Sequence, residues 1–265
     1  YGAGVGTNPS ALYVGGYSVP VPNSTSIQIY DGTNWTTSPA TLGTGGNSIS
    51  STGTSTAGLV FGGSNRLNLT EEWNGSAMSA GGNMSTSKYG RGSANQAPSE
   101  NAMSAGGGIP AQTTVENYDG TSWSTLPSLA VATNDIRGAG TASSAMMMGG
   151  GPGAGPVFNT STEFDQSTNI ITAAAWSSGG SMNTARAFLF GLGPQTAALG
   201  AGGYISTFAP TANSEEYDGT SWTEGNNLNT ARYGISGLGT QTAAVAVGGD
   251  TRPPGTQYNN NSEHY

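Results

Sequence analysis

Residues 215–222 read Glu-Glu-Tyr-Asp-Gly-Thr-Ser-Trp, and this stretch decides the fold because it encodes a β-hairpin. Asp-Gly favours positive φ angles, so Asp218 and Gly219 are expected to form a two-residue turn with Tyr217 opposite Thr220. Trp222 then lies two residues farther along the second strand, on the same face as Tyr217. The stretch therefore predicts a hairpin that carries both large rings on one side.

The same hairpin recurs along the chain. Close copies run over residues 30–35 and 118–123, and weaker copies surround Trp73-Asn74-Gly75 and Phe164-Asp165-Gln166. A sixth copy begins at Tyr265. The second copy has Met78 at the Trp position, and in the fourth Trp176 follows only after a longer loop, which we expect to project from the face opposite the binding loops described below.

Two further landmarks recur in step with the hairpin. A run of small apolar residues ends in Gly-Gly every 43 to 53 residues, starting at Gly15, Gly62, Gly106, Gly149, Gly202 and Gly248. Such a run predicts a strand buried on both faces, and the Gly pair allows the chain to turn sharply after it. A segment of the Thr-Ala-Arg-Tyr-Gly type precedes this run, and we expect it to form the first strand of each unit.

Four short strands in a unit of this length are typical of a β-propeller. We therefore predict an all-β, six-bladed propeller with four-stranded antiparallel blades, built as a single domain over residues 1–265. The repeats fall at roughly 1–40, 41–83, 84–129, 130–180, 181–228 and 229–265. The outer strand of the last blade is missing from this chain. We expect either that the chain is part of a longer one or that another chain completes the sheet.

The order of landmarks resembles the kelch repeat family over the whole chain. Three recurring motifs are similar to kelch-like repeats in tail-fibre and other structural proteins of marine bacteriophages. They are Glu-Tyr-Asp-Gly-Thr-Ser-Trp, Asn-Thr-Ala-Arg and Gly-Thr-Gln-Thr-Ala-Ala. This resemblance implies a location on a virion or extracellular surface. Some kelch-fold enzymes, such as galactose oxidase, use copper with a Tyr–Cys cofactor. That feature does not carry over, because the chain has no Cys.

Composition excludes several classes of partner. The net charge is −8 with seven Lys and Arg residues, which argues against binding to a nucleic-acid backbone. No run of 18 apolar residues is present, so we expect no membrane insertion. Charged residues make up 8% of the chain and Gly is very frequent at 44 residues, yet the regular spacing of the rings indicates a folded repeat protein.

The loops between the Gly-Gly strand and the Tyr strand vary most in length, and equivalent loops of a propeller emerge on one face. A rigid scaffold with variable loops is a common basis for binding. Rings beside Asn and Thr suit sugars, although these rings could instead fold back on the blades as caps. The candidate ligand-binding residues are Tyr17, Phe158, Tyr204, Phe208, Arg252 and Tyr258.

Basic and acidic residues also recur in step with the repeats. The basic residues are Lys88, Arg137, Arg186 and Arg232, and the glutamates two positions before an aromatic are Glu71, Glu116, Glu215 and Glu263. We predict that they pair within or between blades; the alternative is a ring of arginines that recognises an acidic ligand. We assign structural roles to Arg186, Arg232, Glu215, Tyr30, Trp35, Tyr118, Trp123, Trp176, Tyr217 and Trp222.

No catalytic residue, metal site or cofactor is predicted. The aspartates before Gly are explained by the tight turns, so they need no catalytic role. Adjacent glutamates point to opposite faces of a strand and therefore do not share a site. His264 is the only His, which makes a metal site unexpected. An oxygen-only calcium site stays open. We expect a non-enzymatic binding module of a phage-like virion or fibre, which recognises a cell-surface glycan or protein receptor. The alternatives are a structural propeller that docks to other virion or fibre subunits, with oligomer formation, and a glycan-active enzyme.

Overall fold

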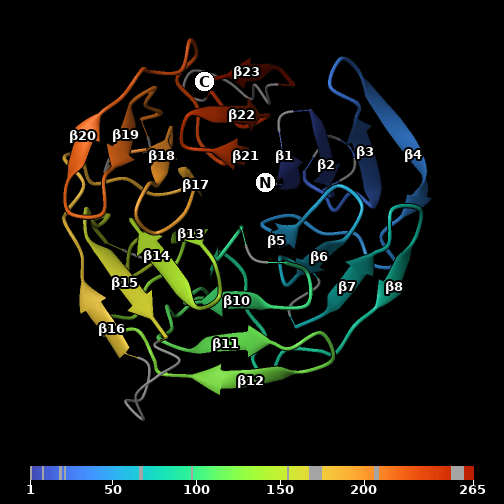
Figure 1. Ribbon diagram of the computed structural model, residues 1–265, viewed down its shortest axis with the longest axis horizontal. Helices are drawn as coiled ribbons and strands as arrows, with labels where there is room; N and C mark the ends of the chain where they lie inside the picture. Colours follow the sequence, from blue (N-terminus) through green and yellow to red (C-terminus); the bar gives the residue numbers. More distant parts are fainter. Residues whose placement is uncertain are drawn as a thin grey trace.

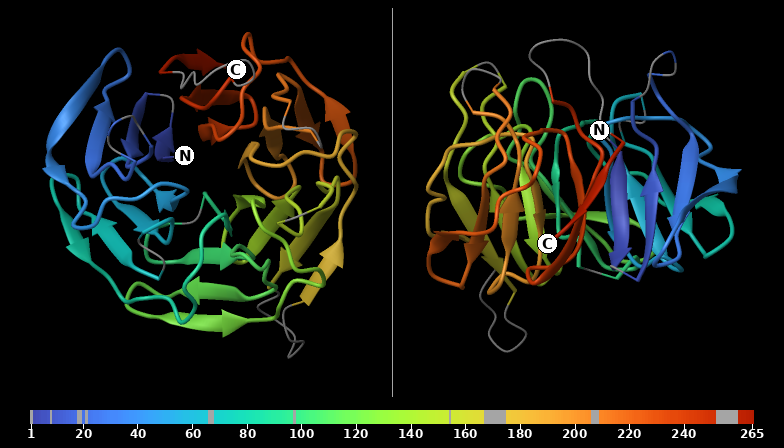
Figure 2. Two further views of the ribbon diagram at one scale, coloured as in Figure 1. Left: turned by 180° about the vertical axis from the view of Figure 1, so that it is seen from behind. Right: turned by 90° about the horizontal axis from the view of Figure 1, so that it is seen from above.

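The computed structural model describes residues 2–7, 9–17, 20, 22–65, 68–96, 98–153, 155–166, 175–205, 209–251 and 260–265. Over these residues every regular element is a β-strand, and the strands form six antiparallel sheets around a central axis (Figures 1 and 2). The predicted six-bladed propeller is therefore confirmed. The described part contains no helix long and apolar enough to cross a membrane.

The strands of the first three blades follow each other outward from the axis. The first blade consists of β1 (Ala3–Thr7), β2 (Ser10–Val14), β3 (Ser26–Tyr30) and β4 (Trp35–Thr41). The second consists of β5 (Ser50–Gly53), β6 (Gly58–Phe61), β7 (Thr70–Trp73) and β8 (Met78–Ala80). The third consists of β9 (Gly92–Ser93), β10 (Ala102–Ala105), β11 (Val115–Tyr118) and β12 (Trp123–Leu126).

The second half of the ring repeats this order. The fourth blade consists of β13 (Arg137–Gly140), β14 (Ser144–Met148), β15 (Ser161–Asp165) and β16 (Ala175–Ser178). The fifth consists of β17 (Phe190–Leu192), β18 (Leu199–Ala201), β19 (Ser214–Tyr217) and β20 (Trp222–Glu224). The last consists of β21 (Ser236–Thr240), β22 (Ala243–Val247) and β23 (Ser262–His264). Among the described residues this last blade has three strands, as predicted.

The hairpin turn differs from the sequence prediction. Tyr217 pairs directly with Trp222, so the loop has four residues and the prediction of Tyr217 opposite Thr220 is wrong. The reason is the Asp218 carboxylate, which accepts the backbone N–H groups of Thr220 and Ser221, both at 2.8 Å, and so stabilises a wider turn. The rings still lie on one face, with their centroids 5.1 Å apart.

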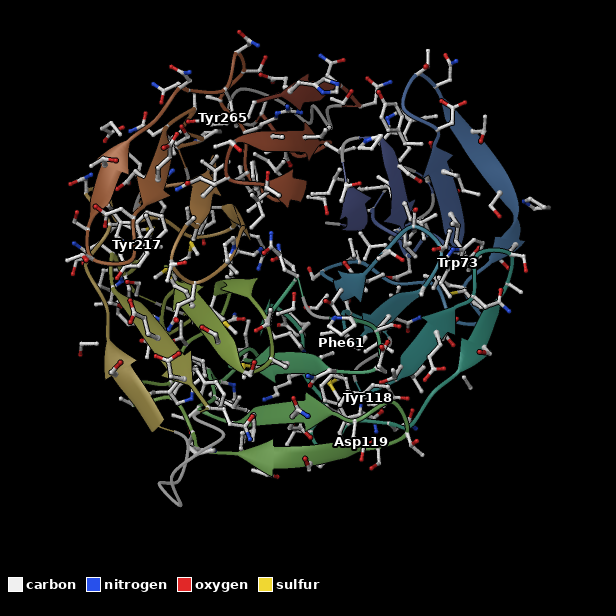
Figure 3. The ribbon with its side chains drawn as sticks, viewed as in Figure 1. Phe61, Trp73, Tyr118, Asp119, Tyr217 and Tyr265 are labelled. Carbon is white, nitrogen blue, oxygen red and sulfur yellow. The ribbon has the colours of Figure 1, made fainter. Side chains whose placement is uncertain are left out.

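These rings pack each blade against the one before it. The Trp123 ring of the third blade lies edge-on to Phe61 of the second, with centroids 4.9 Å apart. The hydroxyl of Tyr118 donates a hydrogen bond to Glu72, also in the second blade (Figure 3). Tyr217 donates in the same way to Glu163 of the fourth blade, and Tyr265 to Glu216 of the fifth. The neighbouring glutamates Glu71 and Glu215 point to the other face of their strands, as predicted.

Two of the predicted ion pairs form, each within one blade. Arg186 contacts Glu215 and Arg232 contacts Glu263, each with N–O distances of 2.7 Å. One feature of the prediction is wrong, because the Thr-Ala-Arg segments precede the inner strands β17 and β21 rather than forming them. Because Arg186 and Arg232 lie in the segment before the inner strand, their side chains can reach the glutamates on a later strand of the same blade. Arg137 instead lies in β13 and donates to the carbonyl of Ile136.

Candidate functional site

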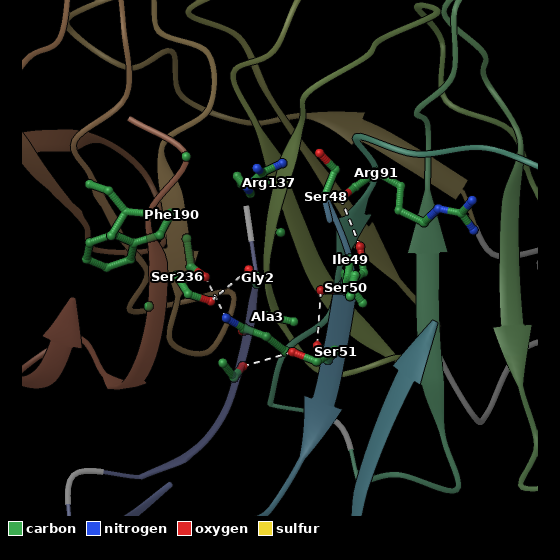
Figure 4. Close-up of a pocket in the computed structure, with 18 residues that line it drawn as sticks. Gly2, Ala3, Ser48, Ile49, Ser50, Ser51, Arg91, Arg137, Phe190 and Ser236 are labelled. Carbon is green, nitrogen blue, oxygen red and sulfur yellow. Dashed lines mark hydrogen bonds between the residues drawn. The ribbon is translucent and has the colours of Figure 1, made fainter. Parts of the chain in front are cut away.

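The inner strands line two cavities along the propeller axis. The inner strands enclose a cavity of about 60 Å³, which is the volume of about two liquid waters (Figure 4). Phe190 packs closely on Gly237 of the last blade, since a Cβ atom built on Gly237 would lie only 2.1 Å from its ring. A second cavity of about 290 Å³ lies toward the other end of the inner strands, where Val5, Gly53 and Leu238 are among its lining residues.

An aromatic cluster stands at the mouth where the inner strands begin. Phe188 and Tyr204 stack with their ring centroids 5.5 Å apart and their planes at 28°. Tyr233 meets both rings edge-on, at 6.3 Å from Phe188 and 5.6 Å from Tyr204. Together with Asp135 and Arg137 of the fourth blade, these three residues form what we call the mouth cluster. Three consecutive blades thus supply its side chains.

Backbone hydrogen bonds hold these rings in place. Ala187 and Tyr204 exchange two of them, at 3.0 and 2.8 Å, so that the loop after β18 is paired to the segment before β17. The carbonyl of Phe188 accepts the N–H of Gly234 in the next blade at 2.9 Å. The cluster is therefore built into the join between the fifth and sixth blades.

Phe188 has an unusual backbone conformation. Its φ angle is 55°, in the left-handed region, and the equivalent position is also left-handed in the second to fourth and last units, where it is occupied by Ser48, Gly90, Asp135 and Gly234. A side chain there costs about 1 to 2 kcal/mol relative to Gly. The recurrence shows that this conformation belongs to the segment that enters each of these blades. What marks Phe188 as a candidate binding residue is its large ring at this position, stacked on Tyr204.

Polar groups of the fourth blade border the stacked rings. The Arg137 guanidinium lies 5.8 Å from the centroid of Phe188 and also lines the channel cavity. Burial raises the pKa of Asp135 to about 6, although Arg137 acts in the opposite direction. Burial, followed by the charge of Asp135 and by Tyr233, raises the pKa of Tyr204 to about 12. At neutral pH the cluster therefore combines a protonated phenol, a cation and a carboxylate around an apolar surface.

The titratable groups give little support for a metal centre. Within the described residues no group of three or more His, Asp or Glu side chains is placed to hold a metal ion. Asp135 is the one carboxyl group in the described ranges for which a raised pKa is resolved. The pKa values of the turn residues Asp31, Asp119 and Asp218 are lowered, chiefly by backbone N–H groups.

No protein-family model and no curated protein sequence matches this chain. Among solved structures, that of YjhT superposes with a TM-score of 0.77 and covers 99% of this chain and 93% of its own. The two sequences are 15% identical, so the likeness concerns the fold alone. The resemblance of the repeats to kelch-like units and to phage fibre proteins stays a prediction.

The structure brings one of the predicted binding residues into the mouth cluster. Tyr204 belongs to it, whereas Tyr17 is 38% exposed on the first blade and Phe158 is half-buried, with its N–H bonded to the carbonyl of Gly150. Phe208, Arg252 and Tyr258 lie outside the described residues. The sequence reasoning missed Phe188 and Asp135. The signal available in the sequence was a large or an acidic residue at a position where the third and last units have Gly.

Proposed function

We propose that this propeller is a non-enzymatic binding module that recognises a glycan through the mouth cluster. The observation that carries the proposal is the stacked pair of Phe188 and Tyr204, held at the channel mouth despite the strained φ angle of Phe188. The resemblance of the repeats to phage fibre proteins supports a place on a virion or another extracellular surface.

The chemistry of the cluster suits a sugar. Tyr and Phe rings offer flat apolar faces to the C–H groups of a pyranose and lose little conformational entropy on binding. Tyr204, Arg137 and Asp135 supply polar groups around those faces, which can orient hydroxyl groups. Because the cluster draws its side chains from three consecutive blades, the sugar lies across the rim of the fourth to sixth blades.

The test measures glycan binding by the purified chain and three variants. We expect Phe188→Ala and Tyr204→Ala to weaken binding by at least tenfold, which corresponds to about 1.4 kcal/mol. Tyr17→Ala removes an exposed ring from the first blade, outside the cluster, and is expected to bind like the parent chain. Circular dichroism confirms that each variant is folded.

Two results would contradict the proposal. Unchanged binding by both cluster variants would place the site elsewhere, and release of sugar products from the bound glycan would make the protein an enzyme. A second candidate function, assembly with partner subunits, is favoured by β23, which has no outer neighbour among the described strands.

A further inference from the structure

The fifth and sixth blades each contain the same slot for a cationic side chain. Arg186 donates hydrogen bonds to the carbonyls of Gly202 and Asn213 and pairs with Glu215. Arg232 makes the corresponding contacts in the sixth blade. Each slot therefore consists of two backbone carbonyls and a carboxylate, and the segment that leads into the blade supplies the cation that fills it.

The fourth blade keeps the backbone of this slot. Gly149 donates its N–H to the carbonyl of Thr160 at 3.1 Å, as Gly202 does to the carbonyl of Asn213 at 2.9 Å. Gly149 is also the first residue of the Gly-Gly pair in its unit, as Gly202 is. Gly149 and Thr160 therefore stand at the two carbonyl positions of the slot.

Both charges of the slot are replaced in the fourth blade. Thr133 lies four residues before β13, the position that Arg186 has before β17. Thr162 lies two residues before the aromatic residue of β15, as Glu215 does in β19. Since the cation and the carboxylate are replaced together, the remaining slot is neutral. A charged ligand buried there would have no counter-ion in the slot, which is costly.

A cavity of about 260 Å³ lies at this neutral slot, which is the volume of about nine liquid waters. Gly149, Thr160, Thr133 and Thr162 all line it. None of the lining residues that the structure describes has an ionisable side chain. Val131, which also lines the cavity, is 59% exposed, so the cavity opens to solvent.

The cavity combines an apolar floor with a hydroxyl-rich rim. Leu129, Ile136 and Met147 line it and belong to one buried core cluster. The Trp176 ring packs against the same cluster, is partly exposed, and is held by a hydrogen bond from its indole N–H to the carbonyl of Pro127 at 2.9 Å. The exposed hydroxyl side chains of the rim belong to Ser177, Ser178 and Ser181.

The polar groups of the slot define which ligand group fits. The carbonyls of Gly149 and Thr160 are acceptors, in the positions that receive a guanidinium in the fifth blade. The Thr133 hydroxyl already donates to the carbonyl of Val131 at 3.0 Å. The Thr162 hydroxyl has no hydrogen bond to another residue of the described ranges, so it can donate into the cavity. A fitting group thus offers an N–H, an oxygen and an apolar end.

We propose that this cavity binds the acetamido group of an N-acetylated amino sugar. The N–H of the group donates to the carbonyl of Gly149 or Thr160, and its oxygen accepts the Thr162 hydroxyl. Its methyl group packs on the apolar floor. The sugar ring lies against Trp176, because an aromatic ring presents an apolar face and the serines of the rim supply hydroxyl partners. A secondary amide is neutral and therefore matches the uncharged slot.

The cavity lies close to the mouth cluster. Thr133 lines the cavity, and Asp135, which belongs to the mouth cluster, follows two residues later. Two residues span at most about 7 Å, so one glycan can contact both places. The inference rests on the proposed function in that the ligand is a glycan, but it depends on a different set of residues.

The probes are N,N′-diacetylchitobiose and cellobiose, which differ in carrying an acetamido group or a hydroxyl at carbon 2 of each ring. We expect the purified chain to bind diacetylchitobiose saturably, and at least tenfold more tightly than cellobiose, in calorimetric titrations. Thr162→Val removes the hydroxyl and keeps the shape of the side chain, so it should weaken binding of diacetylchitobiose at least fivefold. Thr37→Val is the control, since it removes an exposed hydroxyl from β4 of the first blade and should change nothing.

A double variant, Thr133→Arg with Thr162→Glu, rebuilds the ion pair of the fifth blade inside the cavity. It should bind the two sugars equally, because its own side chains occupy the slot, and circular dichroism checks that it is folded. Phe188→Ala should retain the preference for diacetylchitobiose. Loss of glycan recognition at the mouth cluster is thus distinguished from loss of the acetamido site.

The proposal is overturned if the parent chain binds the two sugars equally or binds neither up to about 10 mM. Full preference for diacetylchitobiose in Thr162→Val would also overturn it, and this result does not depend on whether the double variant folds. Binding of N-acetylalanine amide as tightly as diacetylchitobiose would assign the cavity to peptides instead of sugars.

Discussion

The Arg186 guanidinium and the Glu215 carboxylate lie 2.7 Å apart, and neither side chain has any solvent-exposed surface. Two backbone carbonyls share the same guanidinium, and the N–H groups of Asn183 and Thr184 donate to the carboxylate. Each charge is therefore compensated inside the blade. Removing one partner leaves the other buried without its counter-ion, which costs far more than loss of an exposed pair.

Arg186→Ala is expected to lower the free energy of unfolding by about 3 to 5 kcal/mol. Arg232→Ala is the matched variant, because Glu263 is 12% exposed and can regain some hydration. It should therefore cost less. Urea unfolding of both variants checks the order. Loss of glycan binding by Arg186→Ala with unchanged stability would contradict a structural role.

Tyr217→Phe and Tyr118→Phe should each lower the free energy of unfolding by about 2 kcal/mol. Each substitution removes a hydroxyl that bonds a carboxylate of the preceding blade, and bonds to charged groups are worth more than neutral ones. Tyr30→Phe is the control, since the Tyr30 hydroxyl has no hydrogen-bond partner among the described residues. It should change stability by less than about 0.5 kcal/mol. Equal effects in all three variants would refute the importance of these contacts.

Asp135→Asn should stabilise the protein at pH 7 more than at pH 4. The folded pKa of about 6 lies above the ordinary value of 3.8, so the folded state retains its proton while the unfolded chain loses it. Stability therefore falls as pH rises from about 4 to 6, and it stays lower above that range. The asparagine removes this penalty, for a gain of about 3 kcal/mol at pH 7.

Asp31→Asn provides a control of opposite sign for that experiment. Backbone N–H groups of Asn34 and Thr33 hold the pKa of Asp31 below its usual value. Its contribution to stability is present above the ordinary pKa and is lost as pH falls through the lowered one. Thermal melts from pH 3 to pH 8 should show Asp31→Asn destabilising at the upper end only. Parallel pH profiles for the two variants would contradict both assignments.

Phe188→Gly should be more stable than Phe188→Ala by about 1 kcal/mol, although Gly usually destabilises. At a φ angle of 55° the Cβ atom is strained and Gly is not. Both variants lose the ring, so both should lose glycan binding. A more stable alanine variant would show that the segment relaxes out of the left-handed region.

Much of the fold could be predicted because each landmark has a local cause. The Gly-Gly pairs, the ring positions and the spacing between them define six units without any knowledge of contacts between blades. The register of the hairpin was wrong because the sequence does not show which N–H groups the Asp218 carboxylate accepts. The position of Arg186 outside β17 escaped prediction for a similar reason, since two of its partners are the carbonyls of Gly202 and Asn213, which carry no sequence signal.

The candidate site was only partly predictable. Tyr204 stood out as a ring in a variable loop, but its stacking partner lies before β17, in a segment that the repeats made look structural. The relationship between Phe188, Asp135 and Arg137 depends on how neighbouring blades meet. Sequence spacing within one unit does not report that geometry.

The hydroxyl–carboxylate contacts between blades have an evolutionary consequence. Each runs from a Tyr to a Glu in the preceding unit, and the fifth unit carries both parts, Tyr217 for one joint and Glu216 for the next. A tandem duplication of that unit would place a second Tyr217 beside the first Glu216, the same pairing that Tyr265 makes now. The gene could therefore gain a blade by a single recombination event, because the added blade would use a Tyr–Glu contact that already exists.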